Sequence, residues 1–197
     1  DKLTGLGLKG TLSIMLSGGG ITTVRAARRF PVLVIESGPA AGAMAASHYS
    51  RLIRNDALIS FDMGGTTAKM CLINGGSPTR THNFEAARVH RFKKGSGIPL
   101  RVPVIDMIEI GAGGGSIAYC NDLGLLNVGP QSSGSVPGPA CYARGGADPT
   151  VTDADLVLGY IDPNNFLGGR IKLDKSKSIA AVKSVADKLG LSLNEAA

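Results

Sequence analysis

The stretch Phe61-Asp62-Met63-Gly64-Gly65-Thr66-Thr67-Ala68-Lys69 joins two apolar segments, residues 57–61 and 68–73. Each segment has the length of a strand, and the paired glycines suit a tight turn between them. The sequence therefore predicts a β-hairpin whose turn carries an aspartate before it and two threonines within it.

The residue types in this turn are those that a phosphate site requires. Backbone N–H groups can approach a polyphosphate closely at Gly64 and Gly65, while Thr66 and Thr67 add hydroxyl donors. Asp62 could hold Mg²⁺ directly or through a water molecule, since magnesium usually binds one or two carboxylates together with phosphate oxygens. We interpret the turn as a candidate phosphate site. The alternative, a plain hairpin with glycine in its turn, stays open.

A second glycine turn, Gly111-Ala112-Gly113-Gly114-Gly115-Ser116, follows a predicted strand at residues 102–110. It is not a complete dinucleotide-binding fingerprint, because Ile117 stands where the last glycine would be, and it lacks the GKS or GKT of a P-loop. A flat base or a phosphate could still lie over such a turn. Its candidate binding residues are Gly113, Gly114, Gly115 and Ser116.

The rest of the chain alternates predicted strands and helices. Strands at 11–16 and 31–35, with a short helix between them, predict a β-α-β unit, and a helix rich in small residues is expected from Ser37 to about Ile53. Ten glycines between 111 and 146 predict mostly ordered loop. Two further helices are expected, from Thr152 to about Tyr160 and from about Ser178 to Leu189. These expectations favour an α/β fold with flanking helices.

Composition excludes several classes of protein. Among 197 residues, 28 are glycine without a G-x-y period, so a collagen is excluded. No apolar run reaches the roughly 18 residues of a membrane span, and no signal peptide opens the chain, so we expect a cytoplasmic protein. Three widely spaced cysteines indicate reduced thiols.

The net charge of +6 raises the question of nucleic acid. Six basic residues lie between positions 80 and 101, with Glu85 as the only acid there: Arg80, Arg88, Arg91, Lys93, Lys94 and Arg101. This segment lacks interleaved aromatic residues and known nucleic-acid signatures, so a solvated face or loop is the better interpretation. We expect no nucleic-acid partner.

Three further residues could carry chemistry but have simpler explanations. Cys141 has no evident histidine beside it and is expected to be a buried structural thiol. Asp153 and Asp155 are expected to serve a helix N-terminus rather than to form a catalytic carboxylate pair.

Several blocks together resemble one known family. They are Leu16-Ser17-Gly18-Gly19-Gly20, Glu36-Ser37-Gly38-Pro39-Ala40-Ala41-Gly42, Phe61-Asp62-Met63-Gly64-Gly65-Thr66-Thr67, the turn Ile110 to Ala118, Gly138-Pro139-Ala140-Cys141-Tyr142, and Pro149-Thr150-Val151-Thr152-Asp153-Ala154. In this order, and over nearly the whole chain, they look like the hydantoinase A/oxoprolinase family.

The resemblance implies an actin-like ATPase fold, with ATP held between two ribonuclease-H-like lobes around a mixed sheet. It implies ATP and Mg²⁺ as cofactors, with Asp62 as the catalytic metal carboxylate or water-orienting group. Gly64, Gly65, Thr66 and Thr67 would then form the second phosphate loop, and Gly113 to Ser116 the adenosine contact. A hydantoinase B-type subunit or domain is the implied partner.

The implied reaction is ring-opening hydrolysis of a cyclic amide, of the hydantoin or 5-oxoproline type, after phosphate transfer to the amide oxygen. Two alternatives remain: an ATP-dependent ketone carboxylase subunit, and a non-catalytic ATP-binding module of the actin or Hsp70 kind. The first phosphate hairpin of the family is not found, and the helix-start signal Ser192-Leu193-Asn194-Glu195 stands at the end of the sequence. We therefore expect residues 1–197 to be the central part of a longer ATPase domain, inactive by itself.

Overall fold

The computed structural model describes residues 2–86 and 95–197, which form two compact units. Unit 1 comprises Asp1–Asp62 and Lys69–Ile108, and unit 2 comprises Met63–Ala68 and Glu109–Ala197. The chain therefore crosses between units within the predicted hairpin. Arg88, Arg91, Lys93 and Lys94 of the basic segment lie outside the described residues.

Unit 1 begins with helix α1 (Lys2–Gly5) and a small antiparallel pair, β1 (Ser13–Met15) and β2 (Ile21–Thr23). Helix α2 (Val24–Arg29) follows β2 directly, and the Thr23 hydroxyl caps it by accepting a hydrogen bond from the Ala26 N–H. The predicted strand at 31–35 is instead a 3-10 helix, η1 (Pro31–Val34). Because β2 already pairs with β1 and proline fixes a helical φ, the β-α-β prediction is wrong.

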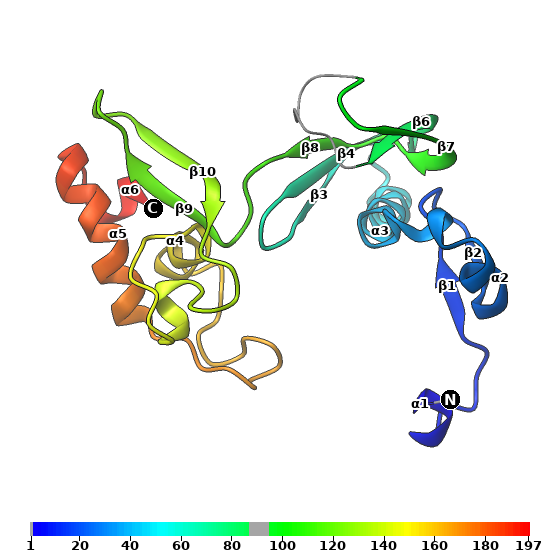
Figure 1. Cartoon of the computed structure of the whole chain (residues 1–197), viewed down its shortest axis with the longest axis horizontal. Helices are drawn as coiled ribbons and strands as arrows, with labels where there is room; N and C mark the ends of the chain where they lie inside the picture. The colour runs from blue at the N-terminus through cyan, green and yellow to red at the C-terminus, as the bar shows by residue number, and fades with distance from the viewer. Residues whose placement is uncertain (1, 87–94) are drawn as a thin grey trace. The chain divides into compact units, whose positions relative to one another are not determined.

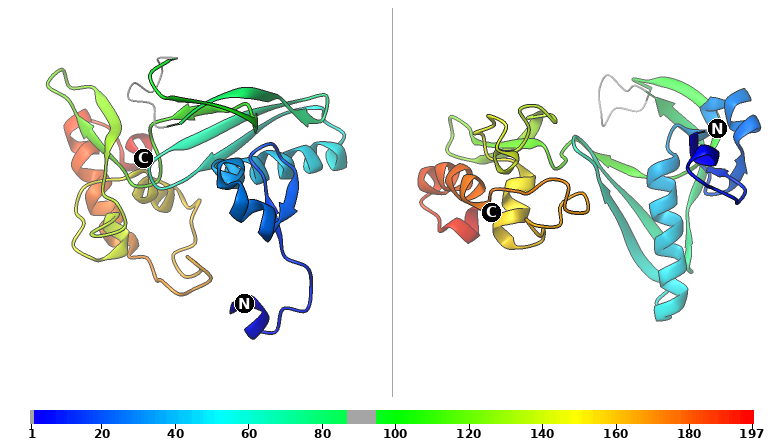
Figure 2. Two further views of the ribbon diagram at one scale, coloured as in Figure 1. Left: turned by 45° about the vertical axis from the view of Figure 1, so that its right-hand side comes forward. Right: turned by 90° about the horizontal axis from the view of Figure 1, so that it is seen from below.

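The centre of unit 1 is a helix packed on a sheet. Helix α3 (Ser37–Ile53) packs against β3 (Ala57–Met63) and β4 (Ala68–Asn74), as Figures 1 and 2 show. Ala40 and Ala43 of α3 are buried against Cys71 and Ile73 of β4. The small side chains of α3 thus allow the helix to approach the sheet closely. Short strands β5 (Ser77–Pro78) and β8 (Ile108–Ile110) both pair with β4.

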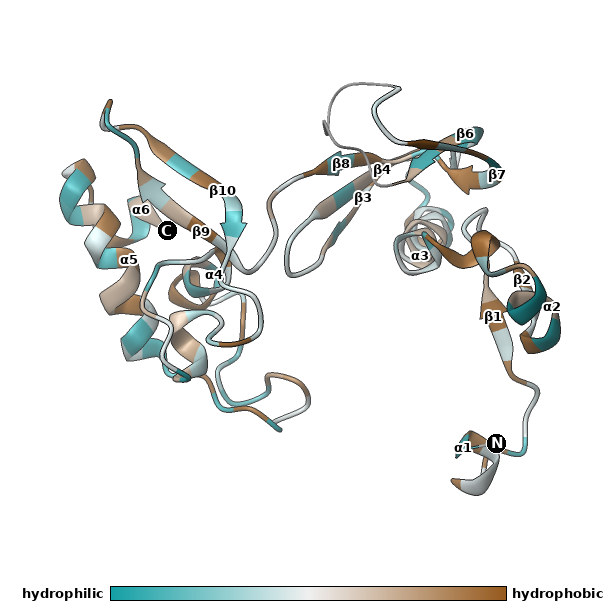
Figure 3. Cartoon of the chain, viewed as in Figure 1, coloured by the Kyte–Doolittle hydropathy of each residue, from teal (hydrophilic) through white to brown (hydrophobic). Residues whose placement is uncertain are grey.

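The other face of this sheet is apolar and exposed. Alternation along the strands buries Ser60, Cys71 and Ile73 toward α3 and leaves Ile59 and Leu72 on the opposite face, more than half exposed. Figure 3 shows these strands as largely hydrophobic. A separate antiparallel pair, β6 (Arg80–Ala86) and β7 (Ile98–Ile105), completes unit 1.

Unit 2 has an antiparallel ribbon with helices packed beside it. The predicted loop at 111–146 contains β9 (Ser116–Cys120) and β10 (Leu126–Ser132), so that expectation is wrong in part. Apolar residues alternate within each segment and favour a strand despite the glycines around them. The 3-10 helix η2 (Ala140–Tyr142), α4 (Val151–Leu158), α5 (Lys175–Leu189) and α6 (Leu193–Ala196) follow.

The helices of unit 2 enclose a second core around Cys141, Leu156 and Leu173. Helix α5 ends at Gly190, and α6 begins with the capping box of Ser192 and Glu195, both as predicted. Helix α4 begins one residue earlier than expected, because Thr150 caps it and Asp153 occupies the third helical position of a capping box.

The α/β class is confirmed, but the strands do not join in one mixed sheet. Those described form four small sheets, and the pairs β1–β2, β4–β5, β6–β7 and β9–β10 are antiparallel. None of the described helices is long and apolar enough to cross a lipid bilayer.

Candidate functional site

A pocket of about 470 Å³ lies in unit 2, where both predicted glycine turns meet. Gly64, Gly65 and Thr66 of the hairpin turn line it together with Gly114 and Gly115. Its other lining residues are Met63, Ser132, Gly134, Ser135, Pro139, Tyr142, Thr152, Asp155 and Ile161. The volume is in the range of small-molecule sites.

Direct hydrogen bonds hold the two turns together. The N–H groups of Gly114 and Gly115 donate to the carbonyl oxygens of Gly64 (2.9 Å) and Gly65 (2.8 Å). The carbonyl of Gly114 accepts from both the N–H and the hydroxyl of Thr152, each at 2.8 Å. Two motifs about 50 residues apart in the sequence, together with α4, therefore build one wall.

The glycines of the second turn are required by this packing. A Cβ at Gly113 would lie 2.6 Å from the Gly64 carbonyl oxygen and 2.6 Å from the Thr66 nitrogen. At Gly114 it would meet the Thr152 hydroxyl, and at Gly115 the Ser132 hydroxyl, each at 2.8 Å. The N–H groups of all three glycines donate hydrogen bonds within the protein. That of Gly113 donates to the Ser116 hydroxyl oxygen at 2.9 Å.

The hairpin turn, by contrast, has hydrogen-bond donors to spare. Gly64 N–H donates to the Thr67 carbonyl at 2.8 Å and closes the turn. The N–H groups of Gly65 and Thr66, and the Thr66 hydroxyl, form no hydrogen bond within residues 2–86 and 95–197. A Cβ at Gly65 would meet nothing within 4 Å, so an anion could approach its backbone closely.

The remaining predicted site residues do not line the pocket. Asp62 is half-buried at the end of β3 in unit 1. Thr67, Gly113 and Ser116 belong to the two turns but are not among the residues that line the pocket. Lys69, next to the hairpin turn in sequence, forms an ion pair with Glu36 inside unit 1. No group of three His, Cys, Asp or Glu side chains suited to a metal ion occurs in the described part of the chain.

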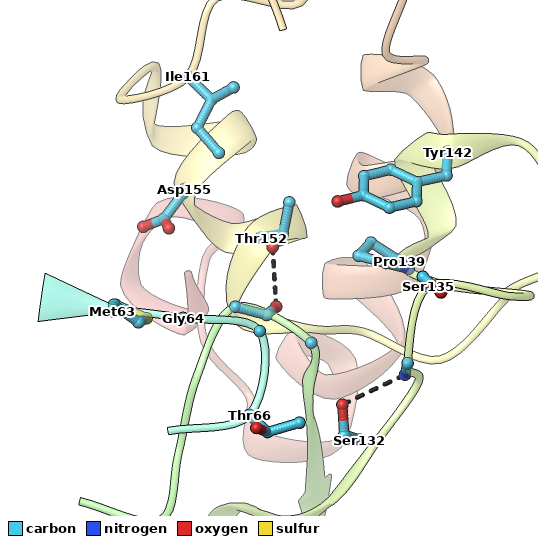
Figure 4. A pocket seen from close by; sticks show the side chains of 14 residues that line it. Met63, Gly64, Thr66, Ser132, Ser135, Pro139, Tyr142, Thr152, Asp155 and Ile161 are labelled. Carbon is cyan, nitrogen blue, oxygen red and sulfur yellow. Dashed lines mark hydrogen bonds between the residues drawn. The ribbon is translucent and has the colours of Figure 1, made fainter. Parts of the chain in front are cut away.

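Sequence reasoning missed the side chains that face the glycine turns. Figure 4 shows Thr152 and Asp155 reaching the pocket from α4, with the Tyr142 hydroxyl pointing into it from another side. Burial raises the pKa of Asp155, and burial together with the nearby Cys141 raises the pKa of Tyr142. The sequence pattern predicted that Asp153 and Asp155 both serve the N-terminus of the helix. This is correct for Asp153, whereas Asp155 lines the pocket.

Asp153 is fully buried and serves the structure. Its carboxylate accepts hydrogen bonds from the N–H groups of Ala140 and Cys141, from both the N–H and hydroxyl of Thr150, and from the Ser178 hydroxyl, at 2.7–3.2 Å. It therefore joins η2, α4 and α5 beneath the pocket. Cys141 is buried, as predicted, and burial followed by the Asp153 charge raises its pKa to about 12.

Two curated proteins illustrate the sequence similarity. An uncharacterized protein of Methanocaldococcus jannaschii is 44% identical over all of this chain, which spans 29% of that protein. The caprolactamase subunit alpha of Pseudomonas jessenii is 41% identical over 92% of this chain, which spans 25% of that subunit. The chain thus covers well under a third of these relatives.

Two solved structures share the fold. A nucleotide-free structure of acetone carboxylase matches 99% of this chain with a TM-score of 0.72 and 30% identity. That enzyme carries out ATP-dependent acetone carboxylation. The ATP-dependent caprolactamase from Pseudomonas jessenii matches 99% with a TM-score of 0.66 and 36% identity. This chain spans 26% and 27% of those two chains.

The family model described as hydantoinase/oxoprolinase matches residues 1–197, the whole sequence. The ordered glycine motifs, the structural similarity and this match agree, which confirms the resemblance seen in the sequence. The chain belongs to the hydantoinase/oxoprolinase family.

Proposed function

We propose that this chain is part of an ATP-dependent enzyme that activates a cyclic amide by phosphorylating its carbonyl oxygen, so that water can open the ring. The observation that carries the proposal is the pocket at the Gly64–Thr66 turn, whose free donors face a cavity of small-molecule size. The family, and relatives described as ATP-dependent, support it. We further propose the actin-like ATPase fold, with residues 1–197 as its central part.

The donor chemistry of the hairpin turn fits a nucleotide phosphate. Gly65 and Thr66 would donate their free N–H groups to phosphate oxygens, and the Thr66 hydroxyl would add a third donor. Thr67 closes the turn through its carbonyl and so keeps Gly65 and Thr66 in place. When bound, ATP supplies a transferable phosphoryl group, and Mg²⁺ partly neutralises its charge.

Asp62 is the residue that we propose to hold Mg²⁺, directly or through water. One carboxylate can suffice for this ion, because magnesium retains several waters and needs only one or two carboxylates beside phosphate oxygens. Gly113, Gly114, Gly115 and Ser116 would support the nucleotide as a rigid backbone surface, since their own N–H groups all donate hydrogen bonds within the protein.

We expect Asp62→Asn to lower ATP turnover about 100-fold in the full-length enzyme assembled with its hydantoinase B-type partner, because an amide binds Mg²⁺ more weakly than a carboxylate. Phosphate release measures the loss, and circular dichroism checks the fold. Asp187→Asn, an exposed site on α5, is the matched control. Unchanged turnover in Asp62→Asn would remove the role proposed for Asp62.

A ketone carboxylase is the second candidate, favoured by the TM-score of 0.72 to acetone carboxylase. Assays of phosphate release on the assembled enzyme separate the two. Stimulation by hydantoin, 5-oxoproline or caprolactam supports the amide reaction, whereas stimulation only by a ketone with bicarbonate supports carboxylation. Stimulation by neither would favour a non-catalytic ATP-binding module.

A further inference from the structure

The Asp155 carboxylate faces the pocket without a protein partner. Its side chain forms no hydrogen bond or ion pair within residues 2–86 and 95–197. Asp153, two residues earlier on the same helix, accepts five hydrogen bonds. A partly buried carboxylate without a partner is costly to maintain, so its place at a cavity wall points to a ligand.

Beside the turn that we assign to phosphate, the pocket offers a hydrogen-bond acceptor and apolar surface. The donors of that turn, at Gly65 and Thr66, would hold the phosphate, and the acceptor is the carboxylate of Asp155. Pro139, Ile161 and the ring of Tyr142 add apolar surface to the pocket wall. A cyclic amide has an N–H for the carboxylate, a carbonyl oxygen that can face the phosphate and an apolar ring, which is the complementary set of groups.

We propose that this pocket binds the cyclic amide itself, and that Asp155 accepts the ring N–H as a hydrogen bond and then as a proton. The inference rests on the proposed function and names the residue that recognises its substrate. Asp155 would act by direct contact with the reacting amide and is therefore a candidate catalytic base.

The proton transfer follows from the balance of the phosphorylation step. As the amide oxygen forms its bond to the γ-phosphorus, the bond from that phosphorus to the bridging oxygen breaks, and ADP leaves with the electron pair. Without proton loss, the ring nitrogen would carry a positive charge. The former lone pair of the nitrogen forms the C=N bond, transfer of its proton to the Asp155 carboxylate leaves the N–H electron pair on nitrogen as a new lone pair, and the product is an O-phosphorylated imidate.

The burial of Asp155 agrees with this role. Burial raises the pKa of Asp155, which makes the carboxylate a better proton acceptor than an exposed aspartate. The same negative charge would repel a polyphosphate placed directly against it. A neutral amide with an N–H donor is therefore the better occupant of this side of the pocket.

The test uses the full-length enzyme with its partner subunit, and caprolactam as the probe. Isothermal titration calorimetry measures caprolactam affinity with ADP present, and ADP affinity by itself. We expect Asp155→Ala to weaken caprolactam at least 10-fold, since hydrogen bonds to charged groups contribute about 1.5–3 kcal/mol. ADP affinity should stay within threefold of the wild type.

Two further measurements separate a direct contact from a structural effect. Asp155→Asn should bind caprolactam within about threefold of the wild type, because its amide oxygen still accepts the N–H, yet lose turnover because it is not a base. N-Methylcaprolactam has no N–H, so its affinity should not differ between the wild type and Asp155→Ala. Asp187→Asn is again the control.

Three results would contradict the inference in distinct ways. Weaker ADP binding with unchanged caprolactam affinity in Asp155→Ala would assign Asp155 to the nucleotide or its metal ion. Equal weakening of caprolactam and N-methylcaprolactam would show a structural role. A wild-type enzyme that binds and hydrolyses ATP but binds neither caprolactam, hydantoin nor 5-oxoproline would overturn the proposed function as well.

Discussion

At the scale of single residues, the surroundings of the buried Cys141 thiol change its pKa. It lies in the core of unit 2, and its backbone N–H donates to the Asp153 carboxylate at 2.9 Å. Burial first, and the negative charge of Asp153 second, raise its pKa from 9.0 to about 12. The protonated thiol is therefore the form that the folded protein accommodates, which agrees with a structural rather than nucleophilic role.

Alkaline pH should destabilise the protein through Cys141. Because the unfolded thiol loses its proton near pH 9.0 and the folded one near 12, the folded state binds the extra proton between these values. The free energy of unfolding therefore falls as pH rises above 9, by roughly 1 kcal/mol at pH 10. Urea unfolding at pH 8 and 10 measures the loss, and Cys141→Ala should lose less. Equal losses in both proteins would refute the assigned cause.

At the scale of elements, the two glycine turns have different reasons for their glycines. The turn at 113–115 has no space for side chains, because the hairpin turn, Thr152 and Ser132 are in contact with it. Gly65 instead borders open space in the pocket. Identical residues thus allow close backbone packing in one turn and leave the backbone of the other open to the pocket.

We expect Gly113→Ala to lower the free energy of unfolding by roughly 2–3 kcal/mol, because the new Cβ would meet backbone atoms that cannot move aside. Gly65→Ala should change stability by less than about 0.5 kcal/mol and mainly weaken phosphate binding. Chemical denaturation followed by circular dichroism compares them. A Gly113→Ala protein as stable as the wild type would show that the turns can separate at little cost.

At the scale of the whole molecule, we expect the excess of positive charge not to mark a nucleic-acid surface. Of the six basic residues between positions 80 and 101, Arg80 donates from Nε to the Gly18 carbonyl at 3.0 Å inside unit 1. The pocket of unit 2 is lined by glycine, hydroxyl and apolar groups with Asp155, and none of the lysines and arginines among residues 2–86 and 95–197 lines it. The charge is therefore not concentrated at the candidate site.

We accordingly expect the chain to bind duplex DNA only weakly, with a dissociation constant of about 10⁻⁵ M or weaker near 150 mM salt, typical of non-specific contacts. Fluorescence anisotropy with a labelled 20-base-pair duplex tests this, and binding should disappear as salt is raised. Submicromolar binding that depends on the DNA sequence would contradict the expectation that nucleic acid is not a partner.

The sequence alone predicted the α/β class, helix α3, the hairpin strands β3 and β4, the start of α6 and the family. These features depend on local patterns: alternating apolar residues, small residues on one helix face, and capping residues at fixed spacings. It also predicted a buried thiol at Cys141. It failed at residues 31–35, where apolar side chains and a proline suit a 3-10 turn as well as a strand.

Only the tertiary structure brought Gly64–Thr66, Gly114 and Asp155 to one pocket. No local pattern reports that Gly114 N–H bonds to the Gly64 carbonyl, or that α4 directs Asp153 into the core and Asp155 into the cavity. Both aspartates suit the first turns of a helix equally well in the sequence. Their surroundings differ because long-range packing gives the carboxylate of Asp153 five donors and places that of Asp155 at the wall of the pocket.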